Sequence, residues 1–537
     1  MEFLLNLVIY LPLIGVLAVL LLRNDTAVKW TAFLATSATF LLSIPLLLNF
    51  DIASSSVPQY VTEGSPILDT MDVKYLVGLD GLSLLLFMLT TLMGPIVILS
   101  SWESVSKSLK GYYAMLLILQ TASLGTFASL DLVVFYVFFE LSLIPMYFLI
   151  GIWGGADRIQ ATIKFFIYTL IGSLIMLVAL LYLGFNAGAA TGIYEFTADW
   201  RFISSPEYTI GLVEQTYMFL AFALAFCIKV PLFPFHTWLP YAHTEAPTAG
   251  SVVLAAIMLK LGTYGLLRIC MPVFPNAFME FAPWLAGLAV IGIIYGALVA
   301  MVQKDVKKLV AYSSVSHLGF VVLGIFAFNT IAVQGAIIQM VNHGLSTGAL
   351  FLIVGMIYDR RHTRMIDDFG GIAKSVPKLA VMFMIATLAS IGLPGLNGFI
   401  GEFFILLGSF NSELYGNVTF AVLAATGVIL AAVYMLWMYQ RVMFGKLDKE
   451  ENKNMVDLNA REISLLVPLV IFMVWIGIRP VDFTVYSEGW VENFITVTEN
   501  KSVTVLEQAD AEQLPDWTAR IYGIDKAEIE SQIVLGD

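Results

Sequence analysis

Residues 251–265 read SVVLAAIMLKLGTYG, an apolar run that carries a single charged side chain, Lys260. Similar runs recur along the whole chain of 537 residues, of which 59% are apolar and 13% are charged. The mean hydropathy is +0.85. A soluble domain has ~45–50% apolar and ~25% charged residues. The composition therefore predicts an integral membrane protein, and the net charge of −12 argues against nucleic-acid binding.

The apolar runs are continuous, which favours membrane helices over the alternating strands of a β-barrel. A helix needs ~20 apolar residues to cross a ~30 Å hydrocarbon core. We predict an all-α polytopic protein with about 14 spans, near residues 3–22, 29–48, 79–100, 112–130, 131–152, 162–186, 215–245, 249–271, 281–302, 306–328, 331–357, 379–409, 417–440 and 464–479. The first run, MEFLLNLVIY, has no basic stretch before it, so we interpret it as a retained helix.

Spans seven and twelve are too long for a simple crossing and are interrupted. Their breaks read KVPLFP (229–234) and GLPGLNG (392–398). Proline removes a backbone donor and clashes with the preceding turn. Broken helices in corresponding places are typical of inverted repeats in transporters. We therefore predict two inverted five-helix repeats, one in residues 111–271 and one in residues 281–445. Helices 1–3 precede the repeats in residues 1–110, and helix 14 follows them in residues 446–480.

Basic residues fall unevenly between the predicted loops. Loops after odd-numbered spans hold 19 of the 28 lysines and arginines, which places both termini outside by the positive-inside rule. Residues 481–537 form an acidic tail outside the membrane, with a helix near Pro515–Ile533. We interpret the tail as a solvated extension whose removal after Arg479 spares transport. The alternative is an arm that docks on a neighbouring subunit.

Six ionisable residues lie deep in the predicted spans, where an isolated charge costs ~2.5–3.5 kcal/mol on insertion scales. They are Glu140, Lys229, Lys260, His317, His343 and Glu402. We expect them at one depth, as a row of proton-exchanging groups that crosses the protein in the membrane plane. One buried Glu–Lys pair alone can instead hold two helices together, and a lone histidine can bond two helices. Six such groups, two of them at helix breaks, favour the relay.

Four other residues in or near the spans have simpler interpretations. His236 and His243, near the end of the broken seventh span, are structural or proton-entry residues. Cys227 and Cys270 lie in apolar segments, and we expect small buried side chains there, with no metal site and no disulfide framework.

Four stretches together resemble a known family. They are FYVFFELSLIPMYFLIGIWGG (135–155), KVPLFPFHTWLPYAHTEAPTAGSVVLAAIMLKLGTYG (229–265), DVKKLVAYSSVSHLGF (305–320) and GLPGLNGFIGEF (392–403). They are similar to the antiporter-like membrane subunits of proton-pumping NADH–quinone oxidoreductase (complex I), over about residues 75–445. The acid at Glu402 resembles the M type, called chain 4 in mitochondria and chloroplasts, because the L and N types usually carry lysine there.

The resemblance implies roles for the six residues. Glu140 and Lys229 would form the coupling pair, Lys260 and His317 with His343 the central relay, and Glu402 the terminal donor towards the outside. It also implies L- and N-type subunits as partners and a bacterial inner membrane as the location. The sequence has no cysteine cluster and no glycine-rich dinucleotide signature, so we expect no cofactor here and place flavin, iron–sulfur clusters and quinone in partner subunits.

Two other functions stay open at this point. The D-type subunit of a multisubunit sodium/proton antiporter would share the relay chemistry without the redox partners. A purely scaffolding membrane subunit would need none of it. Glu402 and the M-like stretches favour a translocating subunit of an NADH:quinone oxidoreductase.

Overall fold

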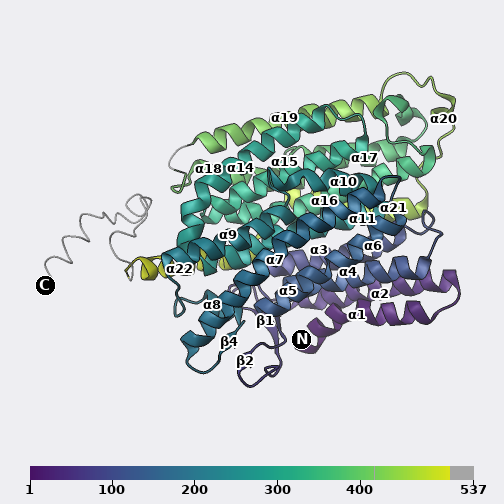
Figure 1. The fold of residues 1–537 in the computed structure, drawn as a ribbon. Coiled ribbons are helices and arrows are strands. Elements are labelled where there is room, and N and C mark those ends of the chain that lie inside the picture. The colour runs from purple at the N-terminus through teal and green to yellow at the C-terminus, as the bar shows by residue number, and fades with distance from the viewer. Residues whose placement is uncertain (416–417, 508–537) are drawn as a thin grey trace, which may run out of the picture.

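The computed structural model describes residues 1–415 and 418–507. Its long helices lie side by side in one bundle (Figure 1). We call the face that carries Lys307 and Arg360 the basic end, and the opposite face, crossed by α22 (Val481–Glu507), the α22 end. Twelve helical stretches of the described chain are long and apolar enough to cross a membrane. The predicted all-α membrane fold is thus confirmed.

The helices follow the predicted spans. The twelve stretches are α1 (Glu2–Leu21), α2 (Asp25–Leu48), α3 (Ser83–Ser100), α5 (Leu132–Leu141) with α6 (Leu143–Trp153), α7 (Arg158–Thr191), α9 (Leu212–Lys229), α11 (Thr248–Val253) to α13 (Met271–Val273), α14 (Pro275–Met301), α15 (Val306–Phe326), α16 (Thr330–Arg361), α19 (Thr419–Met443) and α21 (Ala460–Ile478). The other two predicted spans coincide with α4 (Leu109–Ala128) and with α17 (Pro377–Ser390) plus α18 (Asn397–Phe410). Short elements between them are α8 (Trp200–Ser204), η1 (Phe235–Trp238), α10 (Leu239–Glu245), η4 (Ile366–Asp368), η5 (Ile372–Lys374) and α20 (Glu450–Lys453).

Two helical stretches form the centre of the bundle. The most apolar windows of Thr248–Val273 and of α16 are 100% buried, whereas that of α7 is 39% buried. A helix that is apolar all round and fully buried is a core helix, and one that is half exposed faces its surroundings. Lys260 and His343 therefore lie on the two innermost helices.

Both predicted breaks are present. Helix α9 ends at Lys229, and the next helical turn, η1, begins only at Phe235. Helix α17 ends at Ser390 and α18 begins at Asn397. The prolines in these gaps have no N–H to continue the helical hydrogen bonds, and Gly392 and Gly395 have positive φ values of 74° and 91°, which are not helical.

A third break was not predicted. Helix α5 ends at Leu141, directly after Glu140, and α6 begins at Leu143. Pro145 has no N–H to donate to the carbonyl of Leu141, so the helix is interrupted here for the same reason as at the other two breaks. The central helix is also irregular, with π-helical turns η2 (Leu254–Met258) and η3 (Leu266–Cys270) on either side of Lys260.

Short strands, also not predicted, tie the loops together near the α22 end. Strand β1 (Gln59–Glu63) pairs antiparallel with β3 (Leu76–Leu79), and β2 (Met71–Asp72) pairs parallel with β4 (Phe196–Thr197).

An ion-pair cluster joins these loops. Lys74 Nζ lies 2.8 Å from Glu63, 3.2 Å from Asp72 and 3.3 Å from Asp199. Arg201 Nη2 pairs with Asp199 at 2.6 Å and with Glu63 at 3.1 Å. Hydrogen bonds from Lys74 and Arg201 hold the pKa of Glu63 below its ordinary value. The cluster fixes the β1–β3 hairpin to the segment that leads into α8.

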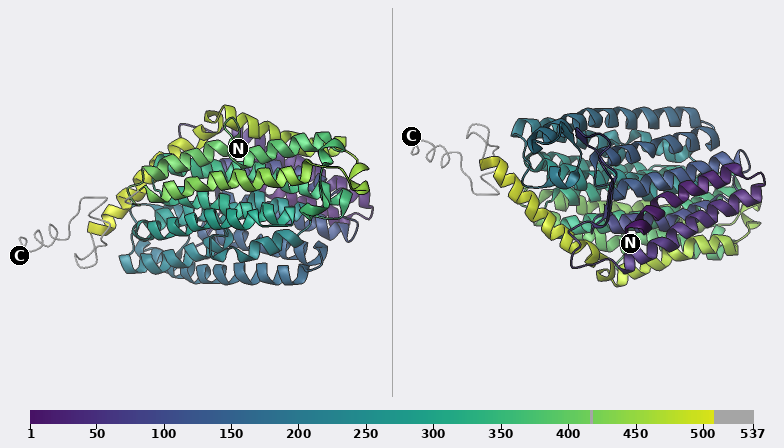
Figure 2. Two further views of the ribbon diagram at one scale, coloured as in Figure 1. Left: turned by 90° about the horizontal axis from the view of Figure 1, so that it is seen from above. Right: turned by 90° about the horizontal axis from the view of Figure 1, so that it is seen from below.

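The interpretation of residues after 480 as a solvated extension is wrong for the described part of the tail. Residues 481–507 form α22, which crosses the end of the bundle obliquely (Figure 2). Trp490 and Lys501 are both buried. Lys501 Nζ donates to the carbonyl of Ile203 at 2.7 Å, and burial lowers the pKa of this lysine to about 7. The predicted helix near Pro515–Ile533 lies outside the described residues.

Helix α22 contacts segments that lie far apart in the sequence. Asn276 on α14 donates to Ser502 Oγ at 3.0 Å, and Gln334 on α16 donates to the carbonyl of Thr484 at 2.6 Å. Trp490 Nε1 donates to Asp80, just before α3, at 3.1 Å. The apolar side chains of α22 pack against the bundle, while its acidic side chains stay in contact with solvent. The net charge of this segment therefore did not predict that it packs on the bundle.

Truncation after Arg479 is therefore expected to destabilise the chain, contrary to the prediction from sequence. Removing Trp490 alone uncovers apolar surface worth about 3–5 kcal/mol, and Asn276 and Gln334 lose their partners. The yield of assembled chain in membranes, and its thermal stability after purification, measure the effect. Replacing the exposed Glu492 with alanine is the control and should leave both unchanged. A truncated chain with wild-type yield and stability would restore the original interpretation.

Candidate functional site: a buried polar track

Lys260 and His343, on two different helices, meet at the centre of the bundle. Lys260 lies on α12 (Leu259–Gly265) and is fully buried. Its Nζ is 2.6 Å from His343 Nδ1 on α16 and donates to the carbonyl of Ala255 at 2.5 Å. A lysine nitrogen and an imidazole nitrogen at this distance can pass a proton directly between them.

The track continues from His343 to His317 and Glu402. The ring centroids of the two histidines are 6.0 Å apart. His317 Nδ1, on α15, lies 2.9 Å from Glu402 Oε1 on α18. The other nitrogen of His317 lies 3.2 Å from Ser390 Oγ, at the end of α17. Four of the six predicted residues thus form one series, and they come from four different elements.

The break between α17 and α18 makes room for the carboxylate of Glu402. Gln339 donates to Glu402 Oε1 at 3.2 Å, while Oε2 has no hydrogen-bond partner among the described residues. At Gly392, which has a φ of 74°, a Cβ would lie 2.9 Å from Oε2. Only glycine combines this left-handed backbone with space for the acid.

Glu140 and Lys229 lie near one another without direct contact. Lys229 is buried at the end of α9, where its Nζ donates to Ser142 Oγ at 3.3 Å and lies 4.7 Å from the ring centre of Phe139. Glu140 is half-buried on α5. No ion pair within 4.0 Å joins the two residues, although both are in the described chain.

The sequence reasoning missed several polar residues that line the track. Ser142, Gln339, Ser390 and Tyr434 all contact one of the six, and Tyr434 OH lies 3.5 Å from His317. Each is a polar side chain inside an apolar helix, which was the available signal. Their type is too common in membrane helices to single them out without coordinates.

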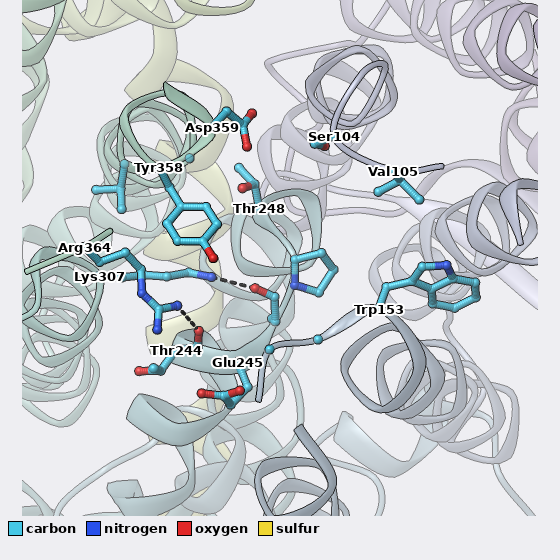
Figure 3. A pocket seen from close by; sticks show the side chains of 16 residues that line it. Ser104, Val105, Trp153, Thr244, Glu245, Thr248, Lys307, Tyr358, Asp359 and Arg364 are labelled. Carbon is cyan, nitrogen blue, oxygen red and sulfur yellow. Dashed lines mark hydrogen bonds between the residues drawn. The ribbon is translucent and has the colours of Figure 1, made fainter. Parts of the chain in front are cut away.

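A polar pocket opens at the basic end (Figure 3). Its volume is about 230 Å³, and its walls include Glu245, Lys307, Asp359 and Arg364. Lys307 Nζ donates to the carbonyl of Ala246 at 2.5 Å. The pocket is thus lined by groups of both signs, at the end of the bundle that carries most of the basic loops.

Buried polar atoms without a protein partner follow one face of α16 inward from this pocket. Gly355 lines the pocket, and Phe351, Thr347 and His343 lie at successive four-residue intervals on the same face. The His243 ring stacks on Phe351 with centroids 4.5 Å apart. Both nitrogens of His243, the hydroxyl of Thr347 and Nε2 of His343 have no partner in the described chain. Buried polar atoms of this kind are usually satisfied by water.

Nothing in this site resembles a metal centre. Within residues 1–415 and 418–507, no three His, Cys, Asp or Glu side chains are grouped to hold a metal ion. Cys227 and Cys270 are free and buried. The chemistry available from these side chains is proton exchange.

The chain is similar to known membrane proteins over most of its length. The family described as NADH:quinone oxidoreductase/Mrp antiporter, TM, matches residues 129–429. NADH-quinone oxidoreductase subunit M of Rhodobacter capsulatus is 46% identical over 489 residues, which cover 89% of this chain and 94% of that protein. NADH-ubiquinone oxidoreductase chain 4 of Marchantia polymorpha is 41% identical and covers 91% of this chain and 96% of its own length.

Solved structures give the same result. A chain of respiratory complex I from Thermus thermophilus, solved with bound NADH, matches with a TM-score of 0.82 and 32% identity, over 92% of this chain and 99% of that chain. A chain of the archaeal membrane-bound sulfane sulfur reductase shares the fold, with a TM-score of 0.76 and 22% identity, over 88% and 76%. The chain belongs to the NADH:quinone oxidoreductase/Mrp antiporter membrane family, among its subunit M relatives.

Proposed function

We propose that this chain carries protons across the membrane as a membrane-arm subunit of an NADH:quinone oxidoreductase. The observation that carries the proposal is the buried series Lys260, His343, His317 and Glu402, with contacts of 2.6 and 2.9 Å at its two ends. Burying four titratable groups together in the centre of a membrane bundle costs free energy, and such groups usually belong to a proton or ion pathway.

Protons enter this series from the basic end. The pocket at Glu245 and Lys307 is the proposed proton entrance. The polar atoms of His243, Thr347 and His343 that have no partner in the described chain lie along the proposed path from this pocket to Lys260. Water molecules between such atoms can conduct protons over distances that side chains alone cannot bridge. This gives His243, open between a structural and an entry role from the sequence, a place on the entry path.

Glu140 and Lys229 act on the series through charge. Lys229 donates a hydrogen bond to Ser142, which lies at the break between α5 and α6, while Glu140 is half-buried on α5. A change in the protonation of Glu140, or a movement that brings the two side chains into contact, alters the charge that Lys260 and its neighbours experience. This is the coupling role that we propose for the pair, and Glu402 would release protons at the far end of the series.

The asymmetry of the basic loops supports an orientation with the basic end inside and both termini outside. We propose a bacterial inner membrane as the location and L- and N-type antiporter-like subunits as the partners. Flavin, iron–sulfur clusters and quinone belong to partner subunits. The runner-up function, the D-type subunit of a multisubunit sodium/proton antiporter, is supported by the shared family description. Co-purification of flavin and iron–sulfur subunits with this chain separates the two.

Replacing Glu140 with glutamine tests the proposal. The change keeps the shape of the side chain and removes its charge, so we expect assembly to be normal and proton pumping to fall at least about tenfold. Vesicles that contain the whole complex allow NADH oxidation and acidification to be followed together. Glu214→Gln, an exposed acid at the start of α9, is the matched control. Wild-type pumping in the Glu140 variant would remove the coupling role.

A further inference from the structure

A large apolar groove lies on the flank of the bundle between α2, α3 and α21. Its volume is about 430 Å³, and its lining includes Leu48, Met88, Leu345, Phe472 and Tyr486. Helix α22 closes its outer end through Asp482, Phe483 and Tyr486. The groove is separate from the polar track, because α16 contributes Val341 and Leu345 to it and turns its polar face the other way.

The lining of the groove sets the kind of molecule that fills it. Apolar walls give water no hydrogen-bond partners, so an apolar space of this kind stays dry. An unfilled groove would also forfeit the dispersion contacts of every side chain along its walls. A hydrocarbon ligand is therefore favoured, and the volume lies in the range of ligand pockets.

The depth of the groove matches one membrane leaflet. Along α3 the lining runs from Leu85 to Leu92, which spans about 10 Å at ~1.5 Å per residue. Half of a ~30 Å hydrocarbon core is about 15 Å. The rim is exposed and apolar, with Leu48 and Ile478 both more than two-thirds exposed, so the groove opens towards the lipid.

Helix α22 excludes a transmembrane helix as the occupant. A spanning helix is about 10 Å wide and continues to the membrane surface. Residues Asp482 to Tyr486 block that continuation, since they form the roof of the groove. A flexible acyl chain can enter sideways beneath the roof from the surrounding leaflet.

Polar groups gather only at the roof. Trp475 Nε1 donates to Asp482 Oδ2 at 2.8 Å. Arg479 lies 3.1 Å from Asp482 Oδ1, and its side chain is 72% exposed. Tryptophan and arginine at this level suit the headgroup region, and the free face of the guanidinium is complementary to a phosphate.

We propose that the groove binds one phospholipid of the outer leaflet, with an acyl chain between α2, α3 and α21 and its phosphate at Arg479. The lipid contacts α16 at Val341 and Leu345, two residues on either side of His343, and it thereby supports the central helix from the side opposite to the relay. The proposed lipid site does not depend on the proposed proton transfer, so each can be tested separately.

Photo-crosslinking in the purified whole complex tests the proposal. A diazirine amino acid replaces Met88 inside the groove or, as the control, Ile471 on the lipid-facing side of α21, which is 54% exposed. After extensive delipidation in detergent, we expect a phospholipid adduct at position 88 and none at 471, identified by mass spectrometry. No adduct at 88, equal adducts at both positions, or an adduct with a quinone tail or another polypeptide would overturn the proposal.

Two substitutions give a second measurement. Met88→Trp fills the groove, so the tightly bound phospholipid should fall by one molecule per chain, whereas Ile471→Trp should not change it. Arg479→Glu should weaken retention of phosphatidylglycerol about fivefold, because it removes one surface cation and adds an anion. An unchanged lipid content in folded Met88→Trp complex would contradict the proposed site.

Discussion

Replacing Lys260 with methionine is expected to stop proton pumping in assembled complex. Methionine has a similar length and no proton to exchange, so His343 loses the partner that lies 2.6 Å away. A positioned acid–base group typically contributes about 100-fold or more to the rate of a proton transfer. We therefore expect pumping per NADH oxidised to fall to the background of the vesicle assay.

Two variants separate proton exchange from charge and from folding. Lys260→Arg keeps a cation that does not release its proton, so it should pump no better than the methionine variant. Lys501→Met removes another buried lysine, on α22 and away from the track. It should lower stability but leave pumping per assembled complex unchanged. Recovery of pumping in Lys260→Arg would show that a fixed charge is enough.

Among single substitutions, the largest expected effect on stability comes from the pair Asp80 and Arg268. Arg268 donates to the two carboxylate oxygens of Asp80 at 2.6 and 2.7 Å, and both side chains are almost fully buried. The rings of Trp200 and Tyr264 lie against the guanidinium, 4.6 and 5.2 Å from its centre. Removing either charge leaves the other buried and unpaired.

Asp80→Asn or Arg268→Met should each cost about 3–5 kcal/mol. The double variant Asp80→Leu/Arg268→Met should recover most of this loss, because a well-packed apolar pair replaces a buried ion pair at little net cost. Thermal denaturation of the purified chain in its complex provides the comparison. Separation of Glu450 and Lys453, an exposed pair, should cost less than about 1 kcal/mol. Additive losses in the double variant would show that the pair is not coupled.

Proline and hydropathy made the fold predictable. The runs of apolar residues located the spans, and the prolines of residues 229–234 located the break after Lys229. Pro145 gives the same signal for the break after Leu141, but Pro45 and Pro95 lie inside continuous helices, so a single proline does not locate a break. The π-helical turns beside Lys260 have no comparable signal, because residues 254–258 are ordinary helix formers.

The site was predictable as a set of residues but not as a set of contacts. Hydropathy gives the depth of a residue along its helix and says little about which neighbour it faces. Lys260, His343, His317 and Glu402 do meet, whereas Glu140 and Lys229 stay apart. In α22, the spacing of Trp490 and Phe494 among acids indicates an amphipathic helix, but the net charge of the tail obscured that pattern.

The contact between Lys260 and His343 has a mechanical consequence. The two residues belong to different helices, α12 and α16, and their nitrogens are 2.6 Å apart. A slide of roughly 1 Å between these helices takes the pair beyond hydrogen-bonding distance. The junction can therefore work as a switch, which a small rigid-body shift opens and closes while every side chain keeps its rotamer.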